Sequence, residues 1–354
     1  VYAGLPCYWL LVEIRCRFTR QLVAWLFLQL KCRHSIVNLI IDLMRYQGMR
    51  QIIYIFLVLL TLSFNSQAFS KAEFSVEDDF SESSLRRGIS ATEEKCNSIP
   101  EKAIWSPVSS NLAECIKYWS YGLTTNTGKA IVYLHEDVSF TNSAYLKLTG
   151  EMVSRYAVEW SRRVKAPYIF IGRPGVYGSS GDQSRRRLLE ESQIISATLD
   201  GLKKKYGINE FVIAGQSGGG HIATSLLTLR DDIVCAVPTS APSSPKIRYL
   251  KMGRSMDTTN HPSYEPTENF KNPVHKDLRV IILGDPKDEA VFWESQTILA
   301  EVLSKRGIPH ILLEGQGGGP QRHFLNNAAR DVASMCFFDK SFEEIKAMEP
   351  RLNG

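Results

Sequence analysis

The chain has 354 residues, 44% of them hydrophobic, which is enough for one large α/β domain or two ordinary ones. Its formal net charge of +5 is uneven, because residues 1–68 hold seven Lys or Arg against two acidic residues and the other 35 basic and 35 acidic residues balance. This balance excludes the one-sided positive surface typical of nucleic-acid binding, so no nucleic-acid partner is expected.

Residues 49–68 have the layout of a secretory signal peptide. Arg50 precedes an apolar run over residues 52–60, and the small residues Ser66 and Ala68 suit a cleavage site after Ala68. The pattern predicts export to the periplasm or the extracellular space. An uncleaved anchor is the alternative, but the run is well short of the roughly 20 apolar residues that span a bilayer. No stable membrane span is therefore expected after cleavage.

Residues 1–48 do not fit this scheme. They include the apolar stretches "LVAWLFLQL" and "IVNLIIDLM", which have no role in front of a signal peptide. We interpret them as translated sequence upstream of a start at Met49, with Met44 as the alternative start. A native membrane hairpin is the competing interpretation.

Four cysteines follow the leader, namely Cys96, Cys115, Cys235 and Cys336. An even number in an exported chain permits two disulfides, and the simplest pairing joins the neighbours Cys96 and Cys115. Buried free thiols are the alternative, above all for Cys235 in the apolar "DIVCAV". No Cys or His spacing suggests a metal site, and no cofactor is expected.

Short apolar runs alternate with amphipathic stretches over residues 96–354. Residues 69–95 are polar and without periodicity, and are predicted to be a linker. Apolar runs at 130–135, 166–172, 210–215, 232–237, 278–284 and 310–315 suit strands buried on both faces. Helical spacing follows in "SRRRLLEESQIISATLDGLKKKYG" and "DEAVFWESQTILAEVLSKRG", each ending at a glycine. The alternation predicts a mainly parallel sheet with helices on both faces.

Residues 244–273 interrupt this alternation. The segment is too long and too polar for an ordinary connection, so we interpret it as an insertion over the carboxyl edge of the sheet. It carries the basic side chains Lys246, Arg248, Lys251 and Arg254 between aromatic and Met residues. These charges could meet a carboxylate of a substrate, or they could face water, as charge runs usually do.

The stretch "GQSGGG" at 215–220 follows an apolar strand and precedes the helical "HIATSLLTLR". A Walker phosphate loop would need Lys and then Ser or Thr after the last glycine, and a dinucleotide-binding loop would need glycine at position 217. What fits is G-x-S-x-G, in which a tight strand-to-helix turn exposes the serine hydroxyl at the carboxyl end of the sheet. The pattern predicts Ser217 as a nucleophile rather than a helix N-cap.

A serine nucleophile needs a histidine base and an orienting carboxylate, in the chain order Ser, Asp, His. Among the seven histidines, only His323 sits in a loop after the last predicted strand. The turn after the strand at 278–284 offers Asp285 and Asp288. Asp288 is preferred, because it starts the next helix whereas Asp285 precedes Pro286 and suits a turn.

The chain resembles the α/β-hydrolase superfamily, and within it the dienelactone-hydrolase and prolyl-oligopeptidase-like serine hydrolases. The resemblance covers residues 110–340 and rests on "YLHED", "GRPGVYGSSGD", "GQSGGGH", "DEAV" and the late His323. It implies an eight-stranded sheet, a triad of Ser217, Asp288 and His323, and an oxyanion hole formed by backbone N–H groups. Dienelactone hydrolases use cysteine as the nucleophile, so the serine argues against their substrate.

One oxyanion donor should be the N–H of Gly218 and the other that of Glu136 or Asp137. Relatives commonly have His-Gly in that loop, whereas here His135 is followed by Glu136. A carboxylate there would repel an oxyanion unless its side chain turned outward.

These residues predict an exported serine hydrolase that cleaves a carboxylic ester or a short peptide. A non-catalytic binding protein with the same fold is one alternative, and an acyltransferase that uses the same triad is another.

Overall fold

In the computed structural model, the protein is described over residues 71–254, 263–270 and 273–353. The predicted leader at 1–48 and signal peptide at 49–68 lie outside the described residues, as does part of the insertion. Residues 71–354 belong to one compact unit. Within the part of the chain that is described, no helix is long and apolar enough to cross a membrane.

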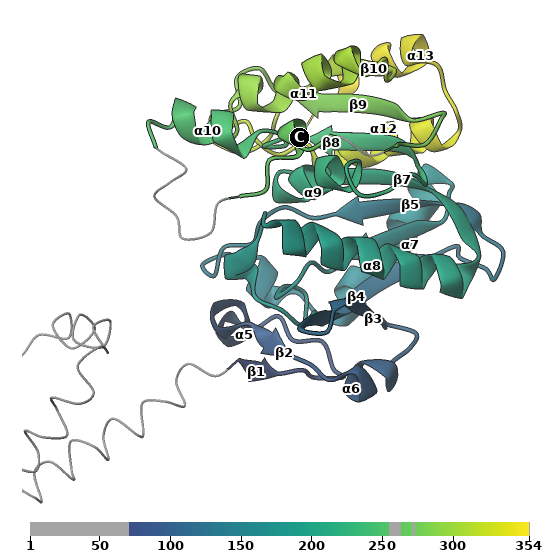
Figure 1. Ribbon diagram of the computed structural model, residues 1–354, viewed down its shortest axis with the longest axis vertical. Coiled ribbons are helices and arrows are strands. Elements are labelled where there is room, and N and C mark those ends of the chain that lie inside the picture. Colours follow the sequence, from purple (N-terminus) through teal and green to yellow (C-terminus); the bar gives the residue numbers. More distant parts are fainter. Residues whose placement is uncertain (1–70, 255–262, 271–272, 354) are drawn as a thin grey trace, which may run out of the picture. The chain divides into compact units, whose positions relative to one another are not determined.

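An eight-stranded sheet forms the centre of this unit, as predicted (Figure 1). Its strands are β3 (Ala103–Ser109), β4 (Leu112–Tyr121), β5 (Gly128–Leu134), β6 (Tyr168–Ile171), β7 (Ile208–Gln216), β8 (Ile233–Thr239), β9 (Arg279–Gly284) and β10 (His310–Glu314). Their order across the sheet is β3-β4-β6-β5-β7-β8-β9-β10. Only β4 is reversed, since it pairs antiparallel with both of its neighbours and the later pairs are parallel.

Helices cover both faces of the sheet, as the continuous apolar runs predicted (Figure 1). One face packs against α7 (Gly150–Val164) and α12 (Asn326–Phe337), and the other against α8 (Leu189–Tyr206), α9 (Gly218–Leu226) and α11 (Trp293–Lys305). Successive residues of β5 alternate between the two cores: Ile131 and Tyr133 face α7 and α12, whereas Val132 and Leu134 face the other side. Both faces of the central strands are therefore buried.

Residues 71–97 correct the prediction of a linker at 69–95. They form β1 (Ala72–Glu73), α5 (Glu82–Arg87), β2 (Ile89–Ser90) and α6 (Glu93–Asn97). Phe74 and Ile89 are buried in a small core with the Cys96–Cys115 disulfide. These elements leave no periodic pattern in the sequence because each is short and contributes only one or two apolar side chains.

Two disulfides join elements that are separated by 19 and 101 residues in the sequence. The predicted pair Cys96–Cys115 joins α6 to β4, and Cys235–Cys336 joins β8 to α12. The alternative of a free thiol at Cys235 is therefore wrong. Both bonds suit an oxidising environment.

The described part of the insertion lies at the carboxyl edge of the sheet, as predicted. Helix α10 (Pro245–Lys251) packs on the start of α11, where Arg248 Nε donates to the carbonyl of Ala290 at 2.9 Å. Further along the insertion, the Tyr264 amide donates to the carbonyl of Arg187 at 2.8 Å. The insertion thus contacts the two loops on either side of the turn that carries Ser217.

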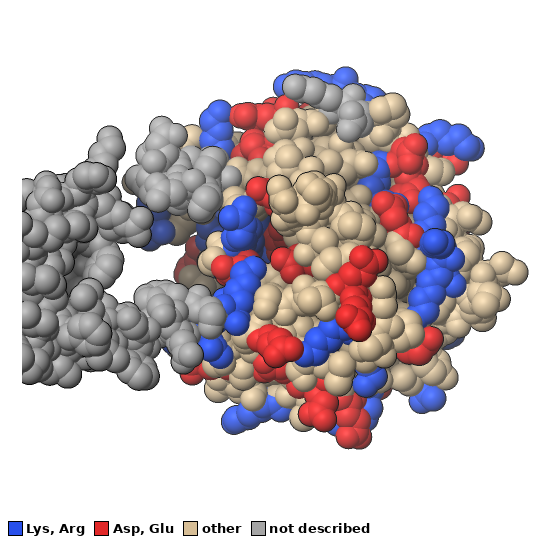
Figure 2. All heavy atoms as spheres, turned by 60° about the horizontal axis from the view of Figure 1, so that its bottom comes forward, with Lys and Arg blue, Asp and Glu red and all other residues tan. Residues whose placement is uncertain are grey.

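Positive and negative side chains are interspersed on the face shown in Figure 2. Exposed ion pairs such as Arg86–Glu82 and Lys340–Glu344 link neighbours of opposite sign.

Candidate active site

Ser217 occupies a strained turn between β7 and α9. Its φ of 54° and ψ of −117° are unusual for a residue with a Cβ atom, and such a conformation costs about 1–3 kcal/mol. Its side chain makes no capping hydrogen bond to α9. Ser217 therefore occupies the N-cap position of α9, but its hydroxyl does not cap the helix and remains available.

The glycines on both sides of Ser217 are required by close backbone approach. A Cβ atom at Gly215 would lie 2.3 Å from the carbonyl oxygen of Gly219, and one at Gly219 would lie 2.1 Å from the carbonyl oxygen of Leu134. Both distances are far below van der Waals contact. Any larger residue at either position would force the turn open.

His323 and Asp288 form the predicted pair. His323 Nδ1 lies 2.8 Å from Asp288 Oδ2, and both side chains are buried. Asp288 Oδ1 accepts the backbone N–H groups of Ala290 and Val291 at 2.8 and 2.9 Å. An ionised carboxylate held in this way favours a proton on Nδ1 and leaves Nε2 of His323 free to accept one.

Asp285 has the turn-forming role that its position before Pro286 suggested. It accepts the amides of Lys287 and Gly317 and pairs with Arg322 at 2.7 Å. Burial alone would raise the pKa of the carboxyl, but these amides and the guanidinium outweigh it and lower the pKa. Asp285 thus fixes the loop that carries His323 without bonding to its imidazole.

Gln216 connects the serine turn to the histidine loop. Its buried side chain donates to the carbonyl of His323 at 2.7 Å and accepts the amide of Leu325 at 3.1 Å. Among the described residues, Ser217 Oγ itself makes no hydrogen bond. The side chain of Gln216 therefore joins the turn of Ser217 to the backbone of His323 and Leu325.

The predicted oxyanion donors lie on two adjacent segments. The N–H of Gly218 is at the start of α9, where helix geometry leaves it without an intrahelical partner. The N–H groups of Glu136 and Asp137 bond to no other described residue, whereas that of Val138 donates to Gln183 Oε1 at 3.1 Å. A Cβ atom at Gly218 would lie 2.0 Å from Asp137 Oδ1, which places the two segments in contact.

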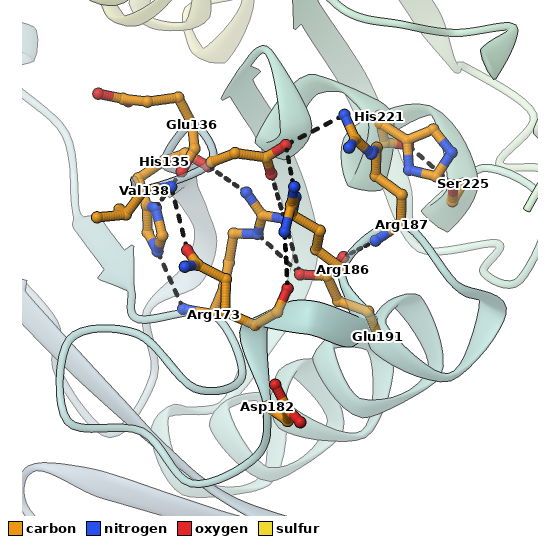
Figure 3. A network of polar contacts seen from close by, with 12 residues as sticks. His135, Glu136, Val138, Arg173, Asp182, Arg186, Arg187, Glu191, His221 and Ser225 are labelled. Carbon is orange, nitrogen blue, oxygen red and sulfur yellow. Dashed lines mark hydrogen bonds and ion pairs between the residues drawn. The ribbon is translucent and has the colours of Figure 1, made fainter. Parts of the chain in front are cut away.

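Three arginines offset the negative charge beside Gly218 (Figure 3). Asp137 lies 2.9 Å from Arg173, 3.1 Å from Arg187 and 3.3 Å from Arg186. Burial would raise the pKa of the Asp137 carboxyl, but the positive charges of Arg187, Arg173 and Arg186 lower it far below its usual range. The carboxylate is thus neutralised within the protein.

Arg173 is the centre of this network. It is 2% exposed and also pairs with the buried Glu191 at 2.8 Å. Burial alone would lower the pKa of its guanidinium, but Glu191 and Asp137 outweigh burial and raise the pKa.

The side chain of Glu136 turns away from this network (Figure 3). The outward orientation of the Glu136 carboxylate therefore avoids the repulsion of an oxyanion that the sequence suggested at this position.

Two further histidines near the site have structural roles. Burial, followed by the charge of Arg173, lowers the pKa of His135 to about 3, so its neutral ring can accept the amide of Arg173 at 3.1 Å. Burial also lowers the pKa of His221 to about 4, and its Nε2 lies 2.9 Å from the carbonyl of Tyr264. Neither ring is placed as the base for Ser217.

The fold family follows from the strand order together with the turn at Ser217. One reversed strand near the edge, a swap of β5 and β6, and a serine turn after the central β7 are its defining features. The chain has the α/β-hydrolase fold.

Comparisons with solved structures return proteins of the same fold at low identity. Acylaminoacyl peptidase from Pyrococcus horikoshii matches over 67% of this chain at 14% identity, with a TM-score of 0.46. Est1E from Butyrivibrio proteoclasticus with bound ferulic acid covers 67% at 15% identity, with a TM-score of 0.45. Mouse alpha/beta hydrolase domain-containing protein 10 covers 67% at 14% identity, also with a TM-score of 0.45.

The share of each neighbour that is covered differs. This α/β-hydrolase chain spans 41% of the peptidase, 99% of Est1E and 96% of the mouse protein. No protein-family model matches the chain, and no curated protein sequence does.

Two residues of the site have no counterpart among the sequence predictions. Gln216 occupies the variable position before the serine, where the motif places no constraint. Arg173 begins "RPGVYGSSGD". Its position directly after an apolar strand was the one sequence signal for a buried ion pair. Each bonds to a residue far away in the sequence.

Proposed function

We propose that the protein is an exported serine hydrolase that cleaves a carboxylic ester or a short peptide through an acyl-enzyme. The observation that carries the proposal is the buried His323–Asp288 pair on a loop that Gln216 fastens to the strained turn of Ser217. A triad of Ser, Asp and His needs this carboxylate–imidazole pair and a serine hydroxyl that is free of other bonds.

In this mechanism Ser217 Oγ attacks the substrate carbonyl while His323 Nε2 takes its proton. Asp288 holds the imidazole in the required tautomer and stabilises the imidazolium that forms. The N–H of Gly218, with that of Glu136 or Asp137, donates to the oxyanion, and each such donor is worth about 3 kcal/mol in other hydrolases. His323 then protonates the leaving group, and a water molecule releases the acyl group by the same steps in reverse.

Export rests on the signal-peptide pattern and on the use of cysteine. All four cysteines after the leader are paired in disulfides. Disulfides persist in the periplasm or outside the cell and are rare in a reducing cytosol.

The test is labelling with a fluorophosphonate probe, which reacts with activated serines. We expect modification at Ser217 in the wild-type protein and none in Ser217→Ala. Ser225→Ala is the matched control, because Ser225 lies on the same helix but is fully buried, donates to the carbonyl of His221 and should not affect labelling. A folded wild-type protein that stays unlabelled would favour a non-catalytic binding protein.

A second prediction concerns the basic residues of the insertion. Lys246 and Lys251 form exposed ion pairs with Glu268 and Glu294. Arg248 is half-buried and has no carboxylate within ion-pair distance among the described residues. Burial, followed by the charge of nearby Arg187, lowers the pKa of its guanidinium, as expected where a positive charge lacks an anion.

We therefore expect Arg248→Gln to raise KM for p-nitrophenyl succinate about tenfold, the loss of one charge-assisted hydrogen bond. The KM for p-nitrophenyl butyrate, which has the same chain length and no carboxylate, should rise far less. The double variant Lys246→Gln/Lys251→Gln is the control and should change neither value. Equal effects of Arg248→Gln on both esters would show that Arg248 only supports the fold.

A further inference from the structure

A cavity with aromatic walls lies between the sheet and the helices α7 and α12. Its volume is about 290 Å³, near the lower limit of small-molecule pockets. The aromatic side chains that line it are Tyr133, Tyr156, Trp160, Tyr168, Phe170 and Tyr177. We refer to it as the aromatic cavity.

The aromatic cavity adjoins both loops of the candidate active site. Its lining includes Glu136, whose neighbour Asp137 lies against Gly218. It also includes Asn326, three residues after His323. A group bound in the cavity would therefore lie against Glu136, on the segment that carries one proposed oxyanion donor, and against Asn326, which begins α12 after the loop of His323.

One guanidinium with unused hydrogen-bonding capacity lines the cavity. Arg330 stacks over the ring of Tyr133 at 3.6 Å and that of Trp160 at 4.6 Å. Its Nε donates to Tyr168 Oη at 2.9 Å and its Nη1 to the carbonyl of Asn326 at 3.1 Å. Among the described residues, no carboxylate pairs with Arg330 and nothing accepts from its Nη2.

One carboxylate lines the same cavity. Glu136 forms no ion pair with any described residue, and its side chain points away from the arginines around Asp137 (Figure 3). The cavity thus contains one positive and one negative group that are not paired with each other within ion-pair distance. Its overall charge is zero.

The charges and ring contacts of the cavity favour an uncharged ligand over a cation or a carboxylate. A cation is disfavoured because Arg330 already occupies the faces of Tyr133 and Trp160. A second carboxylate is disfavoured because Glu136 would repel it. A flat, uncharged ring can stack on the aromatic walls, and an oxygen on that ring can accept from Arg330 Nη2.

We propose that the aromatic cavity binds an uncharged aryl group of the substrate, and that Arg330 recognises an acceptor oxygen on the ring. As a statement about substrate, this proposal rests on the proposed hydrolase function. The binding itself can be tested without catalysis.

The test is isothermal titration calorimetry of the purified protein with two probes of equal shape, 4-methoxybenzyl alcohol and 4-ethylbenzyl alcohol. Only the first has an acceptor oxygen on the ring. We expect it to bind the wild-type protein about tenfold more tightly, as a hydrogen bond to a charged donor predicts. Equal affinities, or no binding of either probe, would overturn the proposal whether or not any variant folds.

Arg330→Met should bind the two probes equally. Arg163→Met is the matched control, because Arg163 also stacks on Trp160, at 4.8 Å, but does not line the cavity. It should keep the tenfold preference. A preference that survives in folded Arg330→Met would assign the recognition to another group and contradict the proposal.

Protection from the fluorophosphonate probe separates this proposal from the proposed function. If the cavity holds part of the substrate, 4-methoxybenzyl alcohol at saturation should slow the labelling of Ser217. Selective binding without protection would place the ligand outside the substrate site and overturn that part of the proposal. Selective binding by a protein that the fluorophosphonate never labels would instead count against the hydrolase function and leave aryl binding standing.

Discussion

Asp288→Asn should lower kcat for p-nitrophenyl acetate about 10⁴-fold, as the same change in the catalytic triad of a serine protease does. Asp288 Oδ2 receives a hydrogen bond from His323 Nδ1, while Oδ1 is held by two backbone amides. An Asn oxygen would keep the amide contacts, so its nitrogen would face His323 and force Nδ1 to accept. The proton would then sit on Nε2, where the base has to be free.

Asp285→Asn is the comparison, because it changes a carboxylate in the same turn. Asp285 contacts Arg322 and backbone amides but not His323. It should reduce kcat much less than Asp288→Asn while lowering the midpoint of thermal unfolding. If the two variants lost activity equally, the assignment of Asp288 as the triad acid would be refuted.

Arg173→Met should lower the free energy of unfolding by about 3–5 kcal/mol, because it leaves the buried Glu191 carboxylate without its cation. Its guanidinium lies within hydrogen-bonding distance of Glu191, Asp137 and the carbonyl of His135. Arg186 and Arg187 still reach Asp137, whereas Glu191 keeps only the amide of Arg187. Urea denaturation measures the loss.

Arg185→Met is the matched control, because Arg185 also pairs with a glutamate at the start of α8. Arg185 and its partner Glu190 are 50% and 40% exposed, and exposed pairs contribute about 0–1 kcal/mol. A loss for Arg173→Met as small as that for Arg185→Met would show that the buried network does not stabilise the fold.

The sequence predicted the strands that are continuously apolar and missed those that are not. Runs such as "FVIAG" stand out because both faces of β7 are buried. Strand β4 contains Lys117, whose charge breaks the apolar pattern although the side chain is buried against Asp78 at 3.1 Å. The burial of Lys117 is explained by its ion pair with Asp78, which lies in a segment predicted to be a linker.

The candidate site also contains residues that the sequence predicts and residues that it does not. The turn at Ser217 and the pairing of Asp288 with His323 were predictable because a motif and a fixed chain order constrain them. The role of Gln216 depends on a carbonyl 107 residues away, and that of Arg173 on Glu191 and Asp137 together. Such contacts follow from the packing of loops, which no local pattern in the sequence encodes.

The Cys235–Cys336 bond turns part of the chain into a covalent ring that contains Asp288 and His323 but not Ser217. Lys251 and Arg254 lie within the ring and are exposed, so a trypsin-like protease in the surroundings could cut there. The cut ends would stay attached through the bond, and Asp288 and His323 would remain tethered to β8, the strand beside the one that leads to Ser217. If the protein is exported as proposed, such a ring would keep the chain connected after a single break in the insertion, until a reductant opened the disulfide.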